Sequence, residues 1–497
     1  MIRGTDDVAR GLAPARESRA IEPGERIHVI GAAGAGASAA ALLAHAAGGA
    51  PDGCDPGAPT PYTEALSARG VPVAPRHDAT HVTNDAPARL AVTKALTSVQ
   101  PDHPELVAAR AAGLPIEAWQ QTVADAARSQ GGRLVAIAGT HGKSTSAGWL
   151  VHMLVAAGRD PGAFVGALLP SALTGGVPAT ARWGAGDAFV VEADEYAGNF
   201  DPYRPDVAVV LNAEWDHPDV FEDQASVIDT FEGWLRAPGA EARRAVINAG
   251  DAGGMELARR LADWGERVLL VAPADVAGEG VTSWRLSGAL LWLSGLPGAA
   301  SQVAAPLRLA GAHNAANAAC VATAGALLGL SGPELAEGLA TFDGVGRRFD
   351  IKGEPGGILV IDDYGHHPTA IRATIEAVRD RYPGRRVWVA HEPLTFHRAA
   401  AMLDQLAAAL AEADEVVVAD IWAGRDPDTT IASPADLAAR VAALSGREVA
   451  APGSPEATAD YLATRVQAGE VVLAMGGGRS YVIAERLVTT LTQRDHE

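Results

Sequence analysis

The segment LVAIAGTHGKST at residues 134–145 predicts a buried strand, a glycine-rich turn and the first turn of a helix. Its glycines allow backbone N–H groups to approach phosphate oxygens, and the helix start adds positive potential. Lys143 supplies a positive charge there, and the hydroxyl of Ser144 can bind Mg²⁺. Ile137 stands where the generic motif has its first glycine, so this is a variant phosphate-binding loop. The alternative is a glycine-rich helix start with an incidental lysine, which is less attractive because the chain has only three lysines.

Polar side chains follow two later strands, which we expect at residues 189–191 and 207–211. The first strand runs into EADEY at 192–196, and the second runs into NAEWDH at 212–217. Because the carboxyl ends of parallel strands meet at one edge of a sheet, both clusters should face the phosphate loop. Carboxylates at that edge can hold Mg²⁺ against a terminal phosphate, and a histidine can complete a second metal site. Taken singly, the same residues would be ordinary solvated loop charges.

A second glycine turn lies near the amino terminus, where Gly31, Gly34 and Gly36 follow an expected strand at 26–30, with Asp55 about twenty residues further on. This order suits a diphosphate at a helix start and an acid that binds a ribose. The turn alone would equally suit a nicotinamide oxidoreductase, although that function leaves the phosphate loop unexplained. Close packing of a helix on a strand would explain its glycines without any ligand.

Short strands alternate with alanine- and leucine-rich helices along the whole chain, which predicts an α/β protein with parallel sheets. A chain of 497 residues exceeds one ordinary core, so several domains are expected. The predicted domains are 25–130, 131–338 and 339–497, after a tail at 1–24. Further strands are expected at 358–361, 387–390, 416–419 and 471–474, and in a β-rich stretch near 278–310.

The composition argues against several classes of function. A net charge of −20 without a long Lys/Arg run argues against nucleic-acid binding. The two cysteines, Cys54 and Cys320, lack metal-ligand spacing, so neither a disulfide framework nor a zinc site is predicted. The first residues lack the apolar core of a signal peptide, and no apolar stretch reaches transmembrane length. We therefore expect a cytoplasmic protein that binds no membrane.

In their order along the chain, these motifs resemble the Mur ligase family, from about residue 26 to about residue 478. The matching segments are 31–38, 137–144, 192–195, 212–217, 311–317, 344–349 and 361–369. The resemblance implies a Rossmann-like domain that binds UDP, a central P-loop ATPase domain, and a C-terminal Rossmann-like α/β domain that receives the amine. The alanine-adding branch is favoured, because sister ligases use a carbamylated lysine and this chain has no lysine between Lys143 and Lys352.

This resemblance implies an ATP- and Mg²⁺-dependent ligase of peptidoglycan precursor synthesis. Its substrates would be the small molecules UDP-N-acetylmuramate and L-alanine. The lactyl carboxylate would pass through an acyl phosphate, with release of ADP and phosphate, in a monomer or homodimer. Two alternatives stay open: a ligase that recycles a murein tripeptide onto UDP-N-acetylmuramate, and a non-catalytic paralogue that binds nucleotide.

The resemblance also assigns roles to single residues by their places in the matching segments. The catalytic residues are Lys143, Glu192, His217 and Arg348, and the metal ligands are Ser144, Glu192 and His217. The ATP-binding residues are Gly139, Thr140, His141, Gly142, Lys143, Ser144, Thr145, His313, Asn314, Asn317, Arg348 and Asp363. The UDP-sugar residues are Gly31, Gly34, Gly36, Ser38 and Asp55. The amino-acid substrate would meet Tyr364, His366, His367 and Arg398. A surface pair at a helix start would also explain the two histidines.

Overall fold

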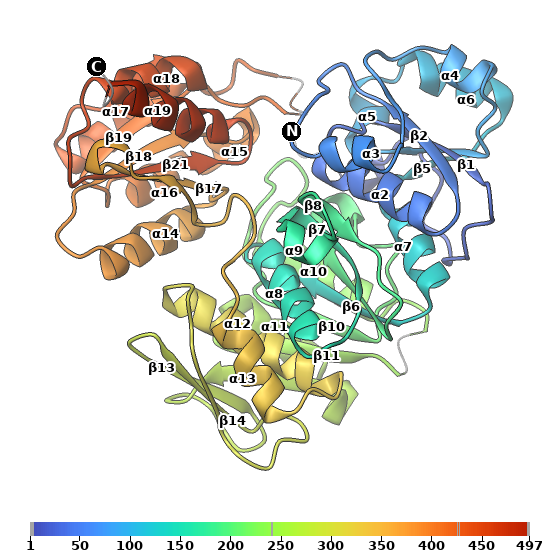
Figure 1. The fold of residues 1–497 in the computed structure, drawn as a ribbon, viewed down its shortest axis with the longest axis horizontal. Coiled ribbons are helices and arrows are strands. Elements are labelled where there is room, and N and C mark those ends of the chain that lie inside the picture. The colour runs from blue at the N-terminus through green and yellow to red at the C-terminus, as the bar shows by residue number, and fades with distance from the viewer. Residues whose placement is uncertain (1–3, 240–241, 425, 427, 495–497) are drawn as a thin grey trace. The chain divides into compact units, whose positions relative to one another are not determined.

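The computed structural model describes residues 4–239, 242–424, 426 and 428–494 (Figure 1). The chain divides into two compact units. The first contains the chain up to Trp215, together with Val220–Arg308 and Asn314–Val345. The second contains Asp216–Asp219, Leu309–His313 and the chain from Gly346 onward. Among the described residues, no helix combines the length and the apolar character needed to cross a membrane.

The first unit begins with a parallel sheet in the order β3-β2-β1-β4-β5. Its strands are β1 (Arg26–Ile30), β2 (Ala50–Cys54), β3 (Val73–Ala74), β4 (Arg89–Val92) and β5 (Ile116–Ala118). The accompanying helices are α1 (Thr5–Val8), α2 (Ala35–Ala46), α3 (Glu64–Ala68), α4 (Thr80–Thr83), α5 (Lys94–Val99), α6 (Pro104–Ala112) and α7 (Trp119–Gln130). Apolar side chains of β1 and α2 are buried together, so the glycine turn between them has a fixed base.

The second sheet of the same unit has the order β15-β14-β13-β12-β11-β10-β6-β9-β7-β8. Its strands are β6 (Arg133–Ala138), β7 (Gly162–Leu169), β8 (Ala179–Arg182), β9 (Ala188–Ala193), β10 (Val207–Val210), β11 (Arg244–Asn248), β12 (Val268–Pro273), β13 (Thr282–Ser287), β14 (Leu290–Ser294) and β15 (Val303–Pro306). Its helices are α8 (Lys143–Ala156), α9 (Ser171–Thr174), η1 (Tyr196–Gly198), α10 (Gln224–Leu235), α11 (Ala252–Arg260), η2 (Ala262–Arg267), α12 (Ala312–Leu327) and α13 (Gly332–Ala340). Strands β9, β6 and β10 are adjacent and parallel, which places three strand ends beside one another.

The second unit contains a sheet in the order β16-β17-β21-β18-β19-β20, parallel except for its edge strand β16. Its strands are β16 (Asp350–Gly353), β17 (Leu359–Asp363), β18 (Val387–Glu392), β19 (Glu415–Ala419), β20 (Ala450–Gly453) and β21 (Val471–Gly476). Its helices are η3 (Pro355–Gly357), α14 (Pro368–Arg381), α15 (Phe396–Ala401), α16 (Leu403–Leu410), α17 (Pro434–Ser445), α18 (Pro455–Ala463) and α19 (Ser480–Arg494). The predicted α/β fold with parallel-rich sheets is therefore confirmed, and so is a β-rich stretch formed by β13, β14 and β15.

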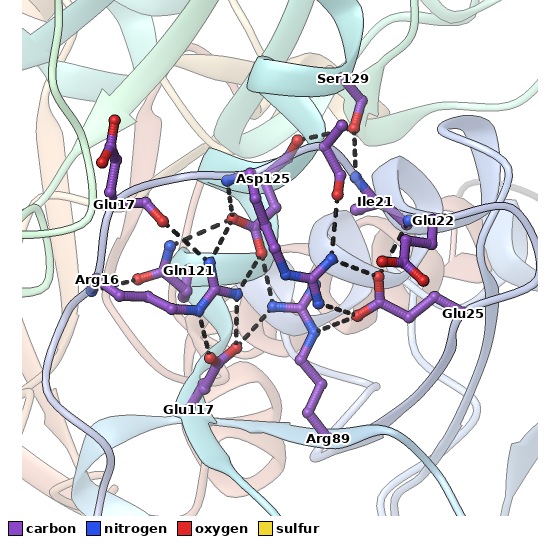
Figure 2. A network of polar contacts seen from close by, with 12 residues as sticks. Arg16, Glu17, Ile21, Glu22, Glu25, Arg89, Glu117, Gln121, Asp125 and Ser129 are labelled. Carbon is purple, nitrogen blue, oxygen red and sulfur yellow. Dashed lines mark hydrogen bonds and ion pairs between the residues drawn. The ribbon is translucent and has the colours of Figure 1, made fainter.

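Part of the predicted amino-terminal tail packs against the first sheet (Figure 2). The guanidinium of Arg16 pairs with Glu117 at 2.7 Å and with Asp125 at 2.6 Å. Ile21 is buried, and its backbone N–H donates to the Ser129 hydroxyl at 2.8 Å. These contacts make the segment just before β1 a part of the folded unit.

Candidate active site

The phosphate-binding loop joins β6 to α8, as the sequence predicted. Gly139 has a φ of 142° and Gly142 a φ of 81°, values that favour glycine. A Cβ on Gly142 would lie 2.7 Å from the side-chain nitrogen of Asn317, so a larger residue would displace that amide. Asn317, predicted to contact ATP from another segment, therefore does lie against the loop.

The strand end after β10 holds the loop in shape. Asn212 accepts the backbone N–H of His141 at 2.9 Å and donates to the carbonyl of the same residue at 3.1 Å. The Thr140 hydroxyl donates to the Glu214 carbonyl at 3.1 Å, and the His141 ring contacts the Glu214 carboxylate at 2.8 Å. Sequence reasoning did not assign a role to Asn212, although the prediction that the segment 212–217 faces the phosphate loop pointed to it. These contacts fix the shape of the loop, and electrostatic catalysis depends on donors that are held in place in this way.

Lys143 is partly buried and lies beside carboxylates. Its ammonium nitrogen Nζ lies 3.0 Å from Oε2 of Glu195 and 3.6 Å from Oδ1 of Asp194. Burial lowers the pKa of Lys143, but Glu195, Asp194 and Glu192 raise it above its ordinary value, so the side chain stays charged. Glu195 was not among the predicted site residues, because a run of three carboxylates does not reveal which one meets the lysine. This charge is the cation that a phosphate would meet.

The predicted metal ligands of the first unit, Glu192 and Ser144, come from β9 and from the first turn of α8. Glu192 is in β9, in register with Ile137 of β6, and its Oε2 accepts the Gly166 backbone N–H at 2.6 Å. Ser144 lies in the first turn of α8 and is buried. A hydroxyl and a carboxylate are hard oxygen donors of the kind that Mg²⁺ prefers.

The amino-terminal glycine turn is tied to the end of β2. The backbone N–H of Gly31 donates to the Cys54 carbonyl at 2.9 Å, and Asp55 accepts the Ala33 N–H at 3.1 Å. A Cβ on Gly36 would lie 2.2 Å from the Trp119 ring, so packing alone accounts for that glycine. The remaining predicted residues differ in surroundings: Gly34 lies in the turn, whereas Ser38 is buried and its hydroxyl contacts Thr180 at 3.2 Å.

In the second unit, residues 347–349 lead into β16 and contact the end of β17. The Arg348 guanidinium lies 4.3 Å from the ring centroid of Tyr364. Asp363 accepts the backbone N–H groups of Phe349 at 2.8 Å and Gly365 at 2.7 Å. Burial raises the pKa of Asp363, against the opposing effects of Arg348 and these hydrogen bonds. Asp363 thus has a structural role in the loop besides the predicted contact with ATP.

A charged cluster forms within the second unit around Asp216. Arg398 is almost fully buried, and its Nε lies 2.7 Å from Oδ1 of Asp216. A second guanidinium nitrogen lies 3.3 Å from Nδ1 of His217, while Nε2 of His366 lies 4.0 Å from Asp216. Burial raises the pKa of Asp216, but Arg398 and the histidines hold it well below its usual range. Three predicted residues, His217, His366 and Arg398, are therefore brought together.

The last predicted residues lie at helix starts. His367 is the N-cap residue of α14, and its ring accepts the Thr369 backbone N–H at 3.3 Å, so one of the two histidines does serve a helix start. His313 and Asn314 both lie in the first turn of α12, where the division between the two units falls.

Three family domains match the chain. Their descriptions are "Mur ligase family, catalytic domain" at residues 26–130, "Mur ligase middle domain" at 137–325, and "Mur ligase, glutamate ligase domain" at 347–478. A curated UDP-N-acetylmuramate–L-alanine ligase from Frankia casuarinae is 36% identical, over 94% of this chain and 98% of its own length.

Two solved structures share the fold. The UDP-N-acetylmuramate–alanine ligase of Thermotoga maritima has a TM-score of 0.75 and 24% identity, covering 95% of this chain and 100% of that one. A murein peptide ligase from Psychrobacter arcticus has a TM-score of 0.71 and 23% identity, covering 94% and 99%. At these identities the two structures show the fold alone, so they do not favour the tripeptide alternative.

Proposed function

The chain belongs to the Mur ligase family, and we propose that it uses ATP to join L-alanine to the lactyl carboxylate of UDP-N-acetylmuramate. The phosphoryl-transfer chemistry rests on one observation: a charged, partly buried Lys143 in a glycine-rich loop beside parallel strand ends. The choice of alanine follows the name of a relative that is similar along nearly the whole chain. The chain is thus an ATP-dependent ligase of peptidoglycan precursor synthesis.

The reaction brings two anions together, a carboxylate and a triphosphate, so the site must offset their repulsion. An oxygen of the lactyl carboxylate attacks the γ-phosphorus of ATP, and the bond between this phosphorus and the oxygen that bridges it to the β-phosphate breaks. The products of this step are ADP and an acyl phosphate. The alanine nitrogen then attacks the acyl carbon, phosphate leaves, and the nitrogen gives up a proton. Lys143 and the N–H groups of the loop at 139–142 supply the positive charge for the first step.

Ser144 and Glu192 are the residues of the first unit that would hold Mg²⁺, since both offer hard oxygen atoms. When bound, the ion supplies charge compensation for the transferring phosphoryl group. Further assignments follow the family resemblance: His217 to a second ion, Arg348 and Asp363 to ATP, and Tyr364, His366, His367 and Arg398 to the amino substrate.

Phosphate release tests this function directly. The protein would be incubated with Mg-ATP and UDP-N-acetylmuramate, and with L-alanine, glycine, L-serine or the murein tripeptide in parallel. We expect L-alanine to give the highest kcat/KM. A higher value with the tripeptide would replace L-alanine as the acceptor while leaving the ligase chemistry intact.

A lysine substitution tests the role of the loop. Lys143→Ala should lower kcat by about a hundredfold or more, the cost of removing one preorganised charge donor. Lys352→Ala is the matched control, because Lys352 pairs with Asp350 at 3.0 Å in the second unit and has no assigned role. Equal turnover by both folded variants would refute the assignment of Lys143, and no ADP with any acceptor would indicate a non-catalytic paralogue.

A further inference from the structure

Side chains of types that can bind metal ions gather at the first sheet, in a different sheet from Lys143, Ser144 and Glu192. They come from β1, the end of β2, the loop between β3 and α4, α4 itself and the start of α6. Their members are His28, Cys54, His77, His81, His103 and Glu105. Because these residues lie in separate segments, no short sequence spacing reveals them, which is why the cysteine pattern predicted no zinc site.

Four of these side chains have the separations of a closed metal site. Sγ of Cys54 lies 3.4 Å from Nε2 of His28, and 3.1 and 3.2 Å from the two carboxylate oxygens of Glu105. Nε2 of His28 lies 3.4 Å from Glu105, and Nδ1 of His81 lies 2.7 Å from it. One ligand atom from each of the four falls within 4.8 Å of all the others. Around a tetrahedral zinc ion, ligand atoms stand about 3.3 to 3.8 Å apart, so the hydrogen-bonded pairs at 2.7 to 3.2 Å would spread when an ion enters.

The cluster also has an outer partner of the kind found at metal centres. Nδ1 of His28 lies 2.5 Å from a carboxylate oxygen of Asp52. A carboxylate on the far nitrogen fixes the histidine tautomer and turns its other nitrogen toward the ion. Nε2 of His28 is the nitrogen that faces Cys54 and Glu105.

Burial separates this cluster from a chance group of surface ligands. The side chains of His28, Cys54 and Glu105 are nearly or fully inaccessible to solvent. His103 is 5% exposed, and neither of its ring nitrogens has a hydrogen-bond partner among the residues that the structure describes. Its ring packs against His77 with a centroid distance of 4.4 Å, and Nδ1 of His77 lies 3.1 Å from the sulfur of Cys54. One buried imidazole, His103, and one partly buried imidazole, His77, thus lie beside the four candidate ligands.

We propose that His28, Cys54, His81 and Glu105 bind one zinc-type dication, with His77 and His103 as neighbours that can exchange into the ligand set. The class of ion follows from the donors, since thiolate and imidazole select zinc-like ions whereas Mg²⁺ takes oxygen ligands. Four protein ligands leave no open position, so the role is structural. The inference does not depend on the ligase function.

The position of the ion gives it a consequence for the glycine turn. The carbonyl of Cys54 accepts the backbone N–H groups of Gly31 at 2.9 Å and Ala32 at 3.3 Å. The carboxylate of the next residue, Asp55, accepts the backbone N–H of Ala33 at 3.1 Å. An ion on the sulfur of Cys54 would therefore fix the strand end that shapes the turn at 31–34.

Cobalt titration of the full-length, untagged protein tests the proposal, after dialysis against a chelator. We expect one equivalent of Co²⁺ to give the charge-transfer absorbance of a cobalt–thiolate bond, zinc to displace it, and excess Mg²⁺ to leave it unchanged. Cys54→Ser should abolish the band, whereas Cys320→Ser, which alters the other buried cysteine, should keep it. An equal band in Cys54→Ser, or none in the wild type, would overturn the proposal.

Two further variants keep the test decisive if Cys54→Ser does not fold. Asp52→Asn removes only the outer carboxylate and should weaken zinc binding roughly 10- to 100-fold. His81→Asn removes a half-buried ligand, and the exposed His45 on α2 provides the control His45→Asn. Zinc affinity that is the same in Asp52→Asn, His81→Asn and His45→Asn would show that the ion binds elsewhere.

Discussion

At the scale of single residues, the partly buried ammonium of Lys143 lies 3.0 Å from the buried carboxylate of Glu195, forming an ion pair at the phosphate-binding loop. The sequence predicted the lysine, because glycine spacing and a preceding strand define a phosphate loop. It did not predict the partner, since the choice among neighbouring carboxylates depends on how the chain turns after β9. Residue types and spacing therefore predict the chemistry of a site better than they predict its pairings.

Glu195→Gln should separate the two roles of this ion pair. Without the carboxylate, Lys143 keeps the more distant Asp194, so the free energy of unfolding should fall by up to about 3–5 kcal/mol. Mg-ATP brings compensating negative charge, so it should raise Tm more in Glu195→Gln than in the wild type. Thermal unfolding with and without Mg-ATP measures both effects. Asp194→Asn alters a more exposed carboxylate, so both its loss of stability and its rise in Tm with Mg-ATP should be smaller than those of Glu195→Gln. An equal rise in Tm with Mg-ATP in the wild type and in both variants would contradict this account.

Arg89 is a second buried charge with several partners (Figure 2). It lies 2.6 Å from both Glu117 and Asp125 and 3.1 Å from Glu25. Arg89→Leu should lower the free energy of unfolding by about 3–5 kcal/mol, because buried carboxylates would lose a partner. Arg486→Ala, which breaks an exposed pair with Asp460, should lower the free energy of unfolding far less. Urea denaturation gives both values, and similar losses would mean that the buried network contributes little.

At the scale of helices and strands, the elements around the active site could be predicted because apolar runs end in glycine or acidic clusters. The predicted strands at 134–137, 189–191 and 207–211 are β6, β9 and β10, and their ends do lie side by side. The order of the other strands in the sheet could not be predicted, since β7 and β8 join its far edge through contacts distant in sequence. The contact made by Asn212 could not be predicted either, because its side-chain amide follows β10 and bonds to the phosphate-binding loop that follows β6.

The end of β18 and the start of α19 should show a pH-dependent contact. Glu392 ends β18, and burial raises its pKa to about 7, although backbone N–H groups of Ser480 and Arg479 oppose the rise. Between its unfolded value of 4.5 and about 7, the folded state keeps a proton that the unfolded state releases. Stability contributed by this group is therefore lost as pH rises through that window, by about 3 kcal/mol in total.

Glu392→Gln tests this contact, because it removes the titration and keeps the shape. The difference between the free energy of unfolding of Glu392→Gln and that of the wild type should increase by up to about 3 kcal/mol between pH 4.5 and 7. Above pH 7 this difference should stay constant. Denaturation at a series of pH values measures it. Glu376→Gln, an exposed position on α14, should show no such trend. A constant difference between Glu392→Gln and the wild type would mean that Glu392 titrates at its ordinary pKa.

At the scale of the whole molecule, the sequence predicted an α/β chain, and the family resemblance correctly implied Rossmann-like and P-loop parts. What it could not predict is which parts share a compact unit. The first two sheets lie in one unit with part of the predicted tail, joined by side chains such as Arg16 and Lys94 whose partners are far away in sequence. Such contacts leave no local pattern, because either partner alone resembles a solvated charge.

Lys94 connects the two sheets of the first unit through its side chain. It begins α5, after β4 of the first sheet, and its buried ammonium donates to the carbonyls of Ala197 at 2.8 Å and Gly198 at 2.5 Å. Both acceptors have positive φ, just after Glu195. Lys94→Met should leave two carbonyls without their donor, at about 1–3 kcal/mol each. It should also lower kcat, since the segment that follows the acidic cluster at 192–195 would lose two hydrogen bonds.

Calorimetry should resolve separate transitions for the two sheets in Lys94→Met, whereas Lys352→Ala should unfold like the wild type. One unchanged transition in Lys94→Met would show that the sheets are coupled by other contacts.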